Sequence, residues 1–510
     1  MPELDCLSLS PIIYAVLCLA WKGGPDLVTI GAMSRAREEF APELLAVALY
    51  KGESPRDLGE DAAGVVSGGD FGGKAGETAL LYGQGGPAPR LLLVGLGERD
   101  LFTMEKFRRA AATVARRARA LGLQTAAFSL PALPDNAVRE IARTVAEGAR
   151  LGLYRFDRHK SAADDQDLET FWLVADEGEL DEATEGAELG AKVAEGTVLA
   201  RDLANEPSNV ATPEYLAQRA RKISEKYGME LAVLDRAGIE EEGLTGLATV
   251  GRSASNEPYF IALEHRRGGD SAPIVLIGKA VTFDSGGISI KPSAGMEDMK
   301  FDMSGGAAVL GTMEAAGALD LPLNIVALVP ATENLPGGDA FKPGDVLQMH
   351  SGKTVEIVTT DAEGRLILAD ALSYARRYEP SAVVDCATLT GACAVALGDH
   401  ASGLMGNEED LVAELKTAGE TTEERAWPLP LFGEYTEQIK GDTADIKNSG
   451  GRRGGALTAG AFLKEFADYP WAHLDVAGTA YGKKGNAYTT KGATGVPARL
   501  LIEFLLGRTR

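Results

Sequence analysis

The pattern of a parallel α/β sheet is clearest in the stretch Ile274-Val275-Leu276-Ile277-Gly278-Lys279-Ala280-Val281-Thr282-Phe283-Asp284-Ser285-Gly286-Gly287. Its first five residues form a short, continuously apolar run, which is typical of a strand buried on both faces of such a sheet. A lysine, an aspartate and paired glycines follow, and we expect them on a loop at the strand end. Ligands of open α/β sheets bind beyond the carboxyl ends of the strands. The polar residues after each strand are therefore candidates for a functional site.

The same pattern extends outward over residues 206–510. Apolar strand-like runs occupy residues 273–278, 324–330, 382–387 and 472–476. Ala-rich segments with helical spacing occupy residues 304–319, 365–378 and 456–466. Continuous apolar strands between helices indicate a mainly parallel central sheet that helices flank on both faces. The sequence therefore predicts a large C-terminal α/β domain.

A smaller α/β domain is predicted for residues 1–176. Strand-like runs at residues 44–50, 91–95 and 171–175 alternate there with helical stretches at residues 104–121 and 135–152. Between Asp164 and Glu188 the chain holds eleven acidic residues and no basic one, and helical spacing of Ala, Leu and Val continues to Asn205. We therefore assign residues 177–205 to an acidic linker and connecting helix, and residues 206–510 to the second domain.

Composition limits the classes of function. The chain has 510 residues, with 51 Lys and Arg against 74 Asp and Glu, a net charge of −23. This acidity disfavours generic nucleic-acid binding, which needs clustered basic residues. Only four Cys and five His are present, without a C-x-x-C or H-E-x-x-H motif. A zinc site of the usual Cys/His type is thereby excluded, so carboxylates must supply most ligands of any bound metal.

No segment of the sequence predicts a membrane span or a targeting signal. The apolar run at residues 11–21 is about half the length that a bilayer requires, and no basic residue precedes it. We interpret this run as a buried strand. The scarcity of Cys and the lack of a secretory pattern predict a reducing, cytoplasmic location.

Four carboxylates in Gly-rich surroundings follow the predicted strands: Asp284, Asp302, Asp361 and Glu363. Any one of them could be a helix cap or a solvated loop residue. If they converge at the strand ends, however, their mutual repulsion requires cations, and divalent metal ions would neutralise them most simply. Oxygen ligands favour Mg, Mn or Zn, and two ions could share a carboxylate and activate a bridging water.

Three basic residues accompany these carboxylates. Lys279 and Lys291 have two available roles, because a lysine ligates a metal only as the neutral amine, whereas a charged lysine nearby polarises a substrate oxygen. The sequence leaves open which lysine has which role. Arg365 follows Asp361 and Glu363 at a predicted helix start, where it could form an anion pocket or pair with a carboxylate.

These motifs together resemble the cytosolic leucyl aminopeptidase (M17) family of two-metal exopeptidases. The resemblance covers residues 185–510 strongly and the preceding part only in layout. It is carried by Lys279, Thr282-Phe283-Asp284-Ser285-Gly286-Gly287, Ile290-Lys291-Pro292, Met299-Lys300-Phe301-Asp302-Met303 and Thr360-Asp361-Ala362-Glu363-Gly364-Arg365-Leu366. It is supported by Asn205-Glu206-Pro207-Ser208-Asn209, Ala387-Thr388-Leu389-Thr390-Gly391, Ala444-Asp445-Ile446-Lys447-Asn448 and the segment from Trp471 to Ala480.

The resemblance implies a role for each site residue. Asp284 and Glu363 would bridge or share two metal ions, Asp361 would complete one metal site, and Lys279 with Asp302 would complete the other. Lys291 would stabilise the oxyanion, and Arg365 would hold a bicarbonate ion as general base. The residues that would line the apolar pocket for the first side chain, suited to Leu or Met, are Met299, Thr388, Leu389 and Gly391.

The resemblance also implies a biological setting. The expected function is metal-dependent removal of N-terminal residues from peptides, with two divalent ions per subunit, Mn or Zn, or else Mg. We further expect a homohexamer in the cytoplasm whose partners are peptide substrates, without a membrane or nucleic-acid partner.

Two positions depart from the usual family pattern. Ala280 replaces a common glycine and adds one methyl group, which we expect to leave metal ligation intact. Thr359 replaces a common asparagine near the pocket, where we expect it to affect the fine substrate preference. We interpret His350 and His473 as structural residues, because neither has a partner at metal-ligand spacing. Cys386 and Cys393 are expected to be buried, unreactive thiols.

Two other classes of function remain for comparison. A DNA-binding or regulatory protein that retains an aminopeptidase fold would use the basic helix at residues 104–121, although a solvated face or a subunit contact explains that helix more simply. A Mg-dependent phosphotransferase would suit the carboxylates. The chain lacks a G-x-x-x-x-G-K-[ST] phosphate loop, however, and its Gly-rich stretches lack the spacing of a dinucleotide site.

Overall fold

The structure is a computed structural model that describes residues 28–34, 41–54, 60–83, 88–101, 103–131, 137–161 and 167–509. The buried strand predicted at residues 11–21 lies outside these ranges. The chain divides into two compact units. The first comprises Met1–Ala194 with Gly485–Thr490, and the second comprises Glu195–Lys484 with Lys491–Arg510.

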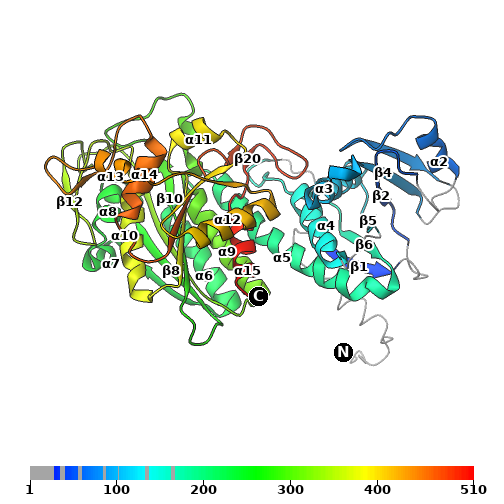
Figure 1. Ribbon diagram of the computed structural model, residues 1–510, viewed down its shortest axis with the longest axis horizontal. Coiled ribbons are helices and arrows are strands. Elements are labelled where there is room, and N and C mark those ends of the chain that lie inside the picture. The colour runs from blue at the N-terminus through cyan, green and yellow to red at the C-terminus, as the bar shows by residue number, and fades with distance from the viewer. Residues whose placement is uncertain are drawn as a thin grey trace. The chain divides into compact units, whose positions relative to one another are not determined.

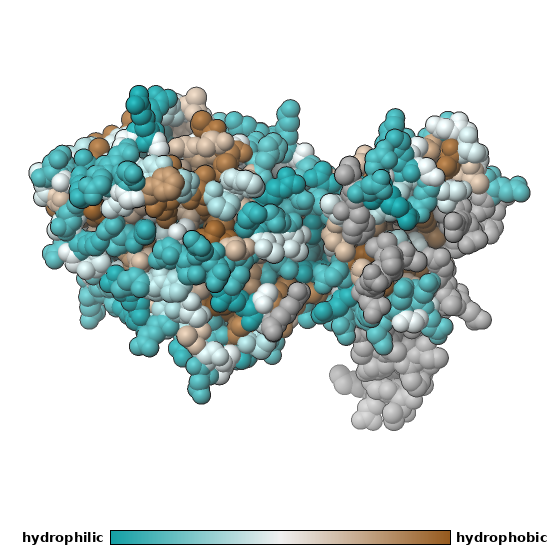
Figure 2. Space-filling view, viewed as in Figure 1, coloured by the Kyte–Doolittle hydropathy of each residue, from teal (hydrophilic) through white to brown (hydrophobic). Residues whose placement is uncertain are grey.

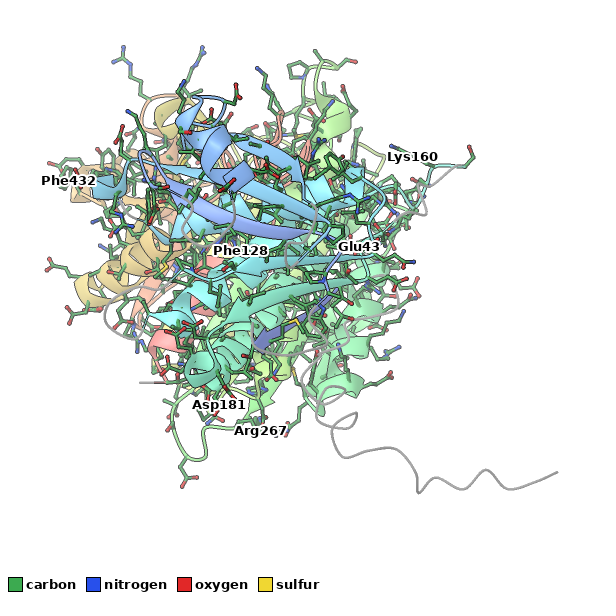
Figure 3. All side chains as sticks on the ribbon, turned by 90° about the vertical axis from the view of Figure 1, so that its right-hand side faces the viewer. Glu43, Phe128, Lys160, Asp181, Arg267 and Phe432 are labelled. Atoms are coloured by element: carbon green, nitrogen blue, oxygen red, sulfur yellow. The ribbon has the colours of Figure 1, made fainter. Side chains whose placement is uncertain are left out.

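The first unit is built on a six-stranded sheet. Its order is β1 (Thr29–Ser34), β6 (Thr170–Ala175), β5 (Thr125–Ser129), β2 (Leu45–Tyr50), β4 (Arg90–Gly97) and β3 (Thr78–Tyr82). Neighbouring strands pair in parallel except β3, which is antiparallel to β4. Helices α3 (Met104–Ala120) and α4 (Val138–Leu153) pack into its core, and α2 (Glu60–Ser67) precedes β3. Phe128 of β5 is fully buried, whereas Lys160 projects outward (Figure 3).

The second unit contains a nine-stranded mixed sheet. Its order is β16 (Ala426–Pro428), β15 (Ser402–Gly406), β18 (Trp471–Asp475), β14 (Ala382–Ala387), β9 (Ile274–Gly278), β11 (Asn324–Asn334), β8 (Tyr259–Arg266) and β7 (Glu230–Leu234), with β10 (Ala280–Asp284) paired to β11. The pairings β16–β15, β18–β14, β14–β9, β9–β11 and β10–β11 are parallel. The predicted sheet of mainly parallel strands is confirmed.

Helices cover both faces of this sheet (Figure 1). One face packs against α6 (Pro213–Tyr227), α9 (Ser304–Leu319), α12 (Glu409–Thr422) and α15 (Ala498–Gly507). The other packs against α7 (Arg236–Glu242), α8 (Thr245–Val250), α10 (Gly364–Ala375) and α14 (Gly455–Lys464). Because the central strands are buried from both sides, their sequences are continuously apolar rather than alternating.

Shorter elements complete the second unit. They are α11 (Gly391–Leu397), α13 (Gly433–Gln438), β12 (Val346–Gln348), β13 (Thr354–Glu356), β17 (Ile446–Lys447), β19 (Tyr481–Gly482) and β20 (Gly492–Ala493). Strands β12, β13 and β17 form a separate three-stranded sheet. β13 ends at Glu356, five residues before Asp361.

The loop predicted directly after Gly278 is wrong in its first part. Ala280–Asp284 form the strand β10, whose partner in parallel pairing is β11. Val281, Thr282 and Phe283 are β-branched or aromatic, and such side chains suit a pleated, buried surface. Lys279 therefore lies between two strands, and Asp284 rather than Lys279 stands where the chain leaves the sheet.

The basic residues of α3 bind within the first unit. Arg108 and Arg109 pair with Glu105 at 2.6 and 2.7 Å. Arg116 donates to the carbonyl oxygens of Asn486 and Thr489, in the segment Gly485–Thr490 that belongs to this unit. These contacts give Arg108, Arg109 and Arg116 structural uses.

The division between the units falls between Ala194 and Glu195, inside helix α5 (Leu180–Asn205). None of the helices in the described ranges is long and apolar enough to cross a membrane. In the view of Figure 2, hydrophilic residues predominate on the surface of each unit.

Candidate functional site

The site forms where β10, β11 and β14 end at one edge of the sheet. Lys279 lies between β9 and β10. Its backbone N–H donates to Cys386 O of β14 at 3.1 Å, and its C=O accepts from Gly306 N of α9 at 2.7 Å. A Cβ on Gly305 would lie 2.1 Å from Cys386 O, so only glycine allows helix α9 to approach this closely. The start of α9 is thereby held against the strand ends.

Lys279 occupies a buried carboxylate cluster. Its side chain is 3% exposed, and Nζ lies 2.7 Å from Asp302 Oδ2 and 2.9 Å from Glu363 Oε1. Nζ also donates to Thr388 O at 3.1 Å. Burial alone lowers the pKa of Lys279, but Asp302 and Glu363 outweigh it and raise the pKa above its ordinary value. The structure thus brings together three residues that lie far apart in sequence.

Lys291 joins the other two carboxylates. Its Nζ lies 2.7 Å from Asp284 Oδ2 and 2.5 Å from Asp361 Oδ1. Oxygen atoms of Asp284, Asp361 and Glu363 lie within 4.8 Å of one another, a spacing that could hold a metal ion. The convergence of the four predicted carboxylates is therefore observed, with a lysine between each pair.

Burial shifts the pKa values of these carboxylates. It raises the pKa of Asp284 to about 6, assisted by the charge of Glu363 and opposed by Lys291. It also raises the pKa of Asp302 to about 8. Burial would likewise raise the pKa of Glu363, but Lys279 and Lys291 overcome it and hold that pKa below its ordinary value. Ionisation of all four carboxylates therefore requires more positive charge than two lysines supply.

The donor set fits divalent metal ions. Four ionised carboxylates and two charged lysines leave a formal excess of two negative charges in a largely buried space. Carboxylate oxygens are hard ligands that suit Mg, Mn and Zn. The two ammonium groups already occupy the gaps between carboxylates as cations would, so the residues present are suitable for holding metal.

Two residues that sequence reasoning did not place in this role support the carboxylates. Asn334, the last residue of β11, donates from Nδ2 to Asp284 Oδ1 at 2.8 Å and to Glu363 Oε2 at 3.4 Å. Thr388 was predicted to line the substrate pocket, and its Oγ1 donates to Asp302 Oδ1 at 2.7 Å. Asn334 could have been found by extending the strand predicted at residues 324–330 to its true end, beside Asp284.

Arg365 lies at the start of α10, next to these carboxylates. Its side chain is buried, and NH1 donates to the carbonyl oxygen of Asn448 at 2.8 Å. Its buried Nε has no hydrogen-bond partner among the described residues. Burial lowers the pKa of Arg365 to about 10, which still leaves the guanidinium charged at neutral pH. An unused buried donor on a cation is suited to binding an anion.

The remaining predicted pocket residues lie on two segments. Met299 is part of the 3₁₀ segment Met296–Met303 that carries Asp302. Leu389 and Gly391 follow β14, where Asp475 accepts from the Leu389 N–H at 3.2 Å and from Thr390 Oγ1 at 2.7 Å. Asp475 thus fixes the start of α11. The pocket roles of Met299, Leu389 and Gly391 stay predictions.

Two histidines and two cysteines that have no assigned chemical role have structural surroundings. His473 is fully buried, and its Nδ1 lies 2.5 Å from Asp385 Oδ1. His350 Nδ1 lies 2.8 Å from Ser373 Oγ. Burial raises the pKa of the thiols of Cys386 and Cys393, which disfavours the reactive thiolate. These arrangements agree with the structural roles expected for them.

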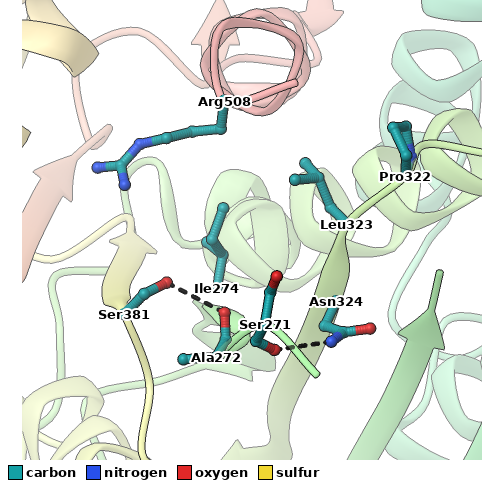
Figure 4. A pocket seen from close by; sticks show the side chains of 8 residues that line it. All are labelled: Ser271, Ala272, Ile274, Pro322, Leu323, Asn324, Ser381 and Arg508. Atoms are coloured by element: carbon teal, nitrogen blue, oxygen red, sulfur yellow. Dashed lines mark hydrogen bonds between the residues drawn. The ribbon is translucent and has the colours of Figure 1, made fainter. Parts of the chain in front are cut away.

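A pocket of about 420 Å³ lies where β9, β11 and β14 begin, opposite the carboxylate cluster (Figure 4). Ser381 and Asn324 make hydrogen bonds to backbone carbonyls at its wall. The guanidinium of Arg508 is paired with Glu414 at 2.6 Å. This pocket brings together no group suited to catalysis, so we place the functional site at the carboxylate cluster.

Comparison with known proteins gives matches over nearly the whole chain. Residues 198–502 match the model of the cytosol aminopeptidase family catalytic domain, and residues 45–163 match its N-terminal domain. A probable cytosol aminopeptidase of Roseiflexus castenholzii is 47% identical, covering 91% of this chain and 96% of that protein. A probable cytosol aminopeptidase of a Geobacter species is 49% identical, covering 86% of this chain and 89% of that protein.

Solved structures resemble the fold equally closely. The bottromycin maturation enzyme BotP in complex with Mn has a TM-score of 0.84 and 36% identity, covering 92% of this chain and all of that chain. A mutant of tomato leucine aminopeptidase has a TM-score of 0.85 and 31% identity, covering 96% of this chain and 99% of that chain.

Proposed function

Since this chain belongs to the cytosol aminopeptidase family and is a metal-dependent aminopeptidase, we propose that it releases N-terminal Leu and other apolar residues from peptides with two metal ions. The observation that carries the proposal is the cluster of Asp284, Asp361 and Glu363, whose oxygens lie within 4.8 Å of one another beside two lysines. Such a cluster is the donor set that a pair of hard divalent ions needs.

We assign the metal ligands as follows. As the family resemblance implies, Asp284 and Glu363 would be shared between the two ions, and the charge of each lysine acts on both carboxylates. Asp361 would complete one site, and Asp302 with Lys279 would complete the other, where Lys279 would have to give up the proton that it holds between Asp302 and Glu363. The bound ions, which we propose to be Mn or Zn, or else Mg, supply Lewis-acid activation of water and substrate.

The chain's own cations serve the reaction beside the metals. Lys291 is 22% exposed, so it can reach both the cluster and an arriving substrate, and we assign it to stabilising the oxyanion. Arg365 keeps its charge and an unused buried donor, so we assign it to holding a bicarbonate ion that accepts a proton as general base.

Hydrolysis of leucine-p-nitroanilide after loading with Mn, Zn or Mg tests this proposal. The Asp284→Ala variant should lose metal and activity together. The Lys291→Ala variant should keep its metal while kcat falls about 10²- to 10³-fold, the range for removing one oxyanion-stabilising group. Lys440→Ala is the control, since the side chain of Lys440 is exposed and pairs with exposed Glu437. Full activity in either test variant would overturn the assigned role.

The assembly and location are part of the same proposal. We propose a homohexamer in the cytoplasm, as the family resemblance implies. Light scattering of the purified full chain measures its mass directly, and a monodisperse monomer would refute the hexamer.

A further inference from the structure

We propose that Asn448 is a positioning residue that holds the loop bearing Asp361 and Glu363, and the guanidinium of Arg365, in a single arrangement. The inference rests on the proposed function, because it concerns the same metal centre. Asn448 touches neither the carboxylate oxygens nor a substrate in this assignment. Its effect on the reaction passes through the residues that it holds.

Asn448 is fixed in place by its backbone. It follows β17 directly, and β17 pairs in parallel with β13 through Val355↔Ile446 and Glu356↔Lys447. The Asn448 N–H continues this pairing by donating to Glu356 O at 3.0 Å. Its side chain is fully buried. The carboxamide therefore has a rigid base, and it must satisfy its polar atoms inside the protein.

Both ends of the carboxamide bind the loop that leads from β13 to α10. Oδ1 accepts from Val358 N at 2.8 Å and from Thr359 N at 3.4 Å. Nδ2 donates to Thr359 O at 2.7 Å and to Ala362 O at 3.5 Å. One side chain thus spans the loop from Val358 to Ala362, the residue between Asp361 and Glu363.

Ile357 makes backbone hydrogen bonds with Gly344 and Asp345, and from Val358 onward side chains set the shape of this loop. Besides the contacts of Asn448, Thr360 N donates to Ser289 Oγ at 3.1 Å, and Asp361 N donates to Thr359 Oγ1 at 3.3 Å. A loop held in this way can shift when one of its anchors is lost. Asp361 is already the most exposed of the four carboxylates, so it depends most on such anchors.

The main chain of Asn448 holds the guanidinium of Arg365. Arg365 NH1 donates to Asn448 O at 2.8 Å. The same residue therefore fixes two metal-ligand positions through its side chain and the guanidinium through its carbonyl group. Because catalytic groups must keep their mutual distances to within a fraction of an ångström, a shared anchor of this kind favours the productive geometry.

The Asn448→Asp substitution tests the role with little change in volume. An ionised carboxylate could still accept from Val358 N, but it would repel Thr359 O and Ala362 O, to which Nδ2 now donates. Asn407→Asp is the control for the substitution at an exposed asparagine, whereas Asn448 is buried. Asn407 also accepts from a backbone amide, Trp471 N at 2.8 Å, and donates to a backbone carbonyl, Tyr469 O at 2.9 Å. It follows β15, away from the carboxylate cluster.

Three quantities should be measured on the full chain after removal of metal with EDTA: Mn²⁺ affinity by calorimetry, the melting temperature, and kcat and KM with leucine-p-nitroanilide. We expect Asn448→Asp to bind Mn²⁺ at least tenfold more weakly and to lose at least tenfold in kcat, with a smaller change in KM. The control should remain within twofold of the wild type. A folded Asn448→Asp variant with Mn²⁺ affinity and kcat within twofold of the wild type would overturn the proposal.

A second variant, Asn448→Ser, covers the case in which Asn448→Asp does not fold. Serine adds no charge and is too short to reach both Val358 and Ala362, so the weaker Mn²⁺ binding should persist. Wild-type affinity in this variant, or a failure of both variants to fold, would show that Asn448 serves only stability. If the wild type lacks peptidase activity, the proposed function fails, while the Mn²⁺ affinities still decide the role of Asn448.

Discussion

Replacing Lys279 by methionine tests how far the carboxylate cluster depends on its internal cation. Methionine has a similar length and volume, so the Lys279→Met variant removes the charge and leaves the packing nearly unchanged. The ammonium group now lies within 2.9 Å of oxygens of both Asp302 and Glu363. The variant leaves both carboxylates buried and facing each other without that cation.

The expected magnitude follows from burial. Lys279, Asp302 and Glu363 are each less than 10% exposed, so water compensates little for the missing charge. Removing one partner of a buried ion pair costs about 3–5 kcal/mol, because the remaining charge is left uncompensated. Two carboxylates are affected here, which places the expected loss in metal-free stability toward 5 kcal/mol. An exposed pair contributes only about 0–1 kcal/mol.

Urea unfolding in EDTA at pH 8, followed by far-UV circular dichroism, measures this loss. Two compact units can give two transitions, so the transition that the variant shifts must be analysed separately. Lys440→Met is the control, because Lys440 and Glu437 are both more than 60% exposed. An equal loss of stability in Lys279→Met and Lys440→Met would refute the reasoning that the buried cluster needs Lys279.

Three further outcomes are expected. Burial raises the pKa of Asp370 from 3.8 to about 7, so this carboxyl group ionises at lower pH in the unfolded chain than in the folded one. Between pH 5 and pH 8, the free energy of unfolding of the wild type should therefore fall by about 3 kcal/mol more than that of Asp370→Asn. An equal pH dependence of the two proteins in urea unfolding would contradict this. Thr388→Val removes the hydroxyl that donates to Asp302, so metal-free stability should decrease by about 2 kcal/mol, and an unchanged urea midpoint would argue against that bond. Adding Mn²⁺ at 100 times its Kd to the EDTA-treated wild type should raise the free energy of unfolding by about 2.7 kcal/mol. The Asp284→Ala variant should show no such gain. An equal gain in that variant would exclude Asp284 as a metal ligand.

Much of the fold could be predicted from local patterns. The helix at residues 304–319 and the strand at residues 382–387 agree residue for residue with α9 and β14. Their apolar periodicity is set by burial on one side or both, which a sequence displays directly. The loop expected after Gly278 was wrong in its first part, because Val281 and Phe283 pair with β11, and the sequence does not show which distant strand lies beside them.

By itself, the sequence determined which residue types the site contains. Its carboxylates, lysines and arginine stand directly after apolar runs or at helix starts, and their chemistry favours hard metal ions in a chain poor in His and Cys. The tertiary structure decided how these side chains are arranged. It placed one lysine between each pair of carboxylates. It also brought Thr388 to Asp302, Asn334 to Asp284, and Asn448 to the loop that carries Asp361 and Glu363. Several of these contacts join residues far apart in sequence, such as Asn334 with Asp284, 50 positions apart, and Asn448 with Val358, 90 positions apart. Hydrogen bonds act over about 3 Å, so such partners become identifiable only after the strands have been placed side by side.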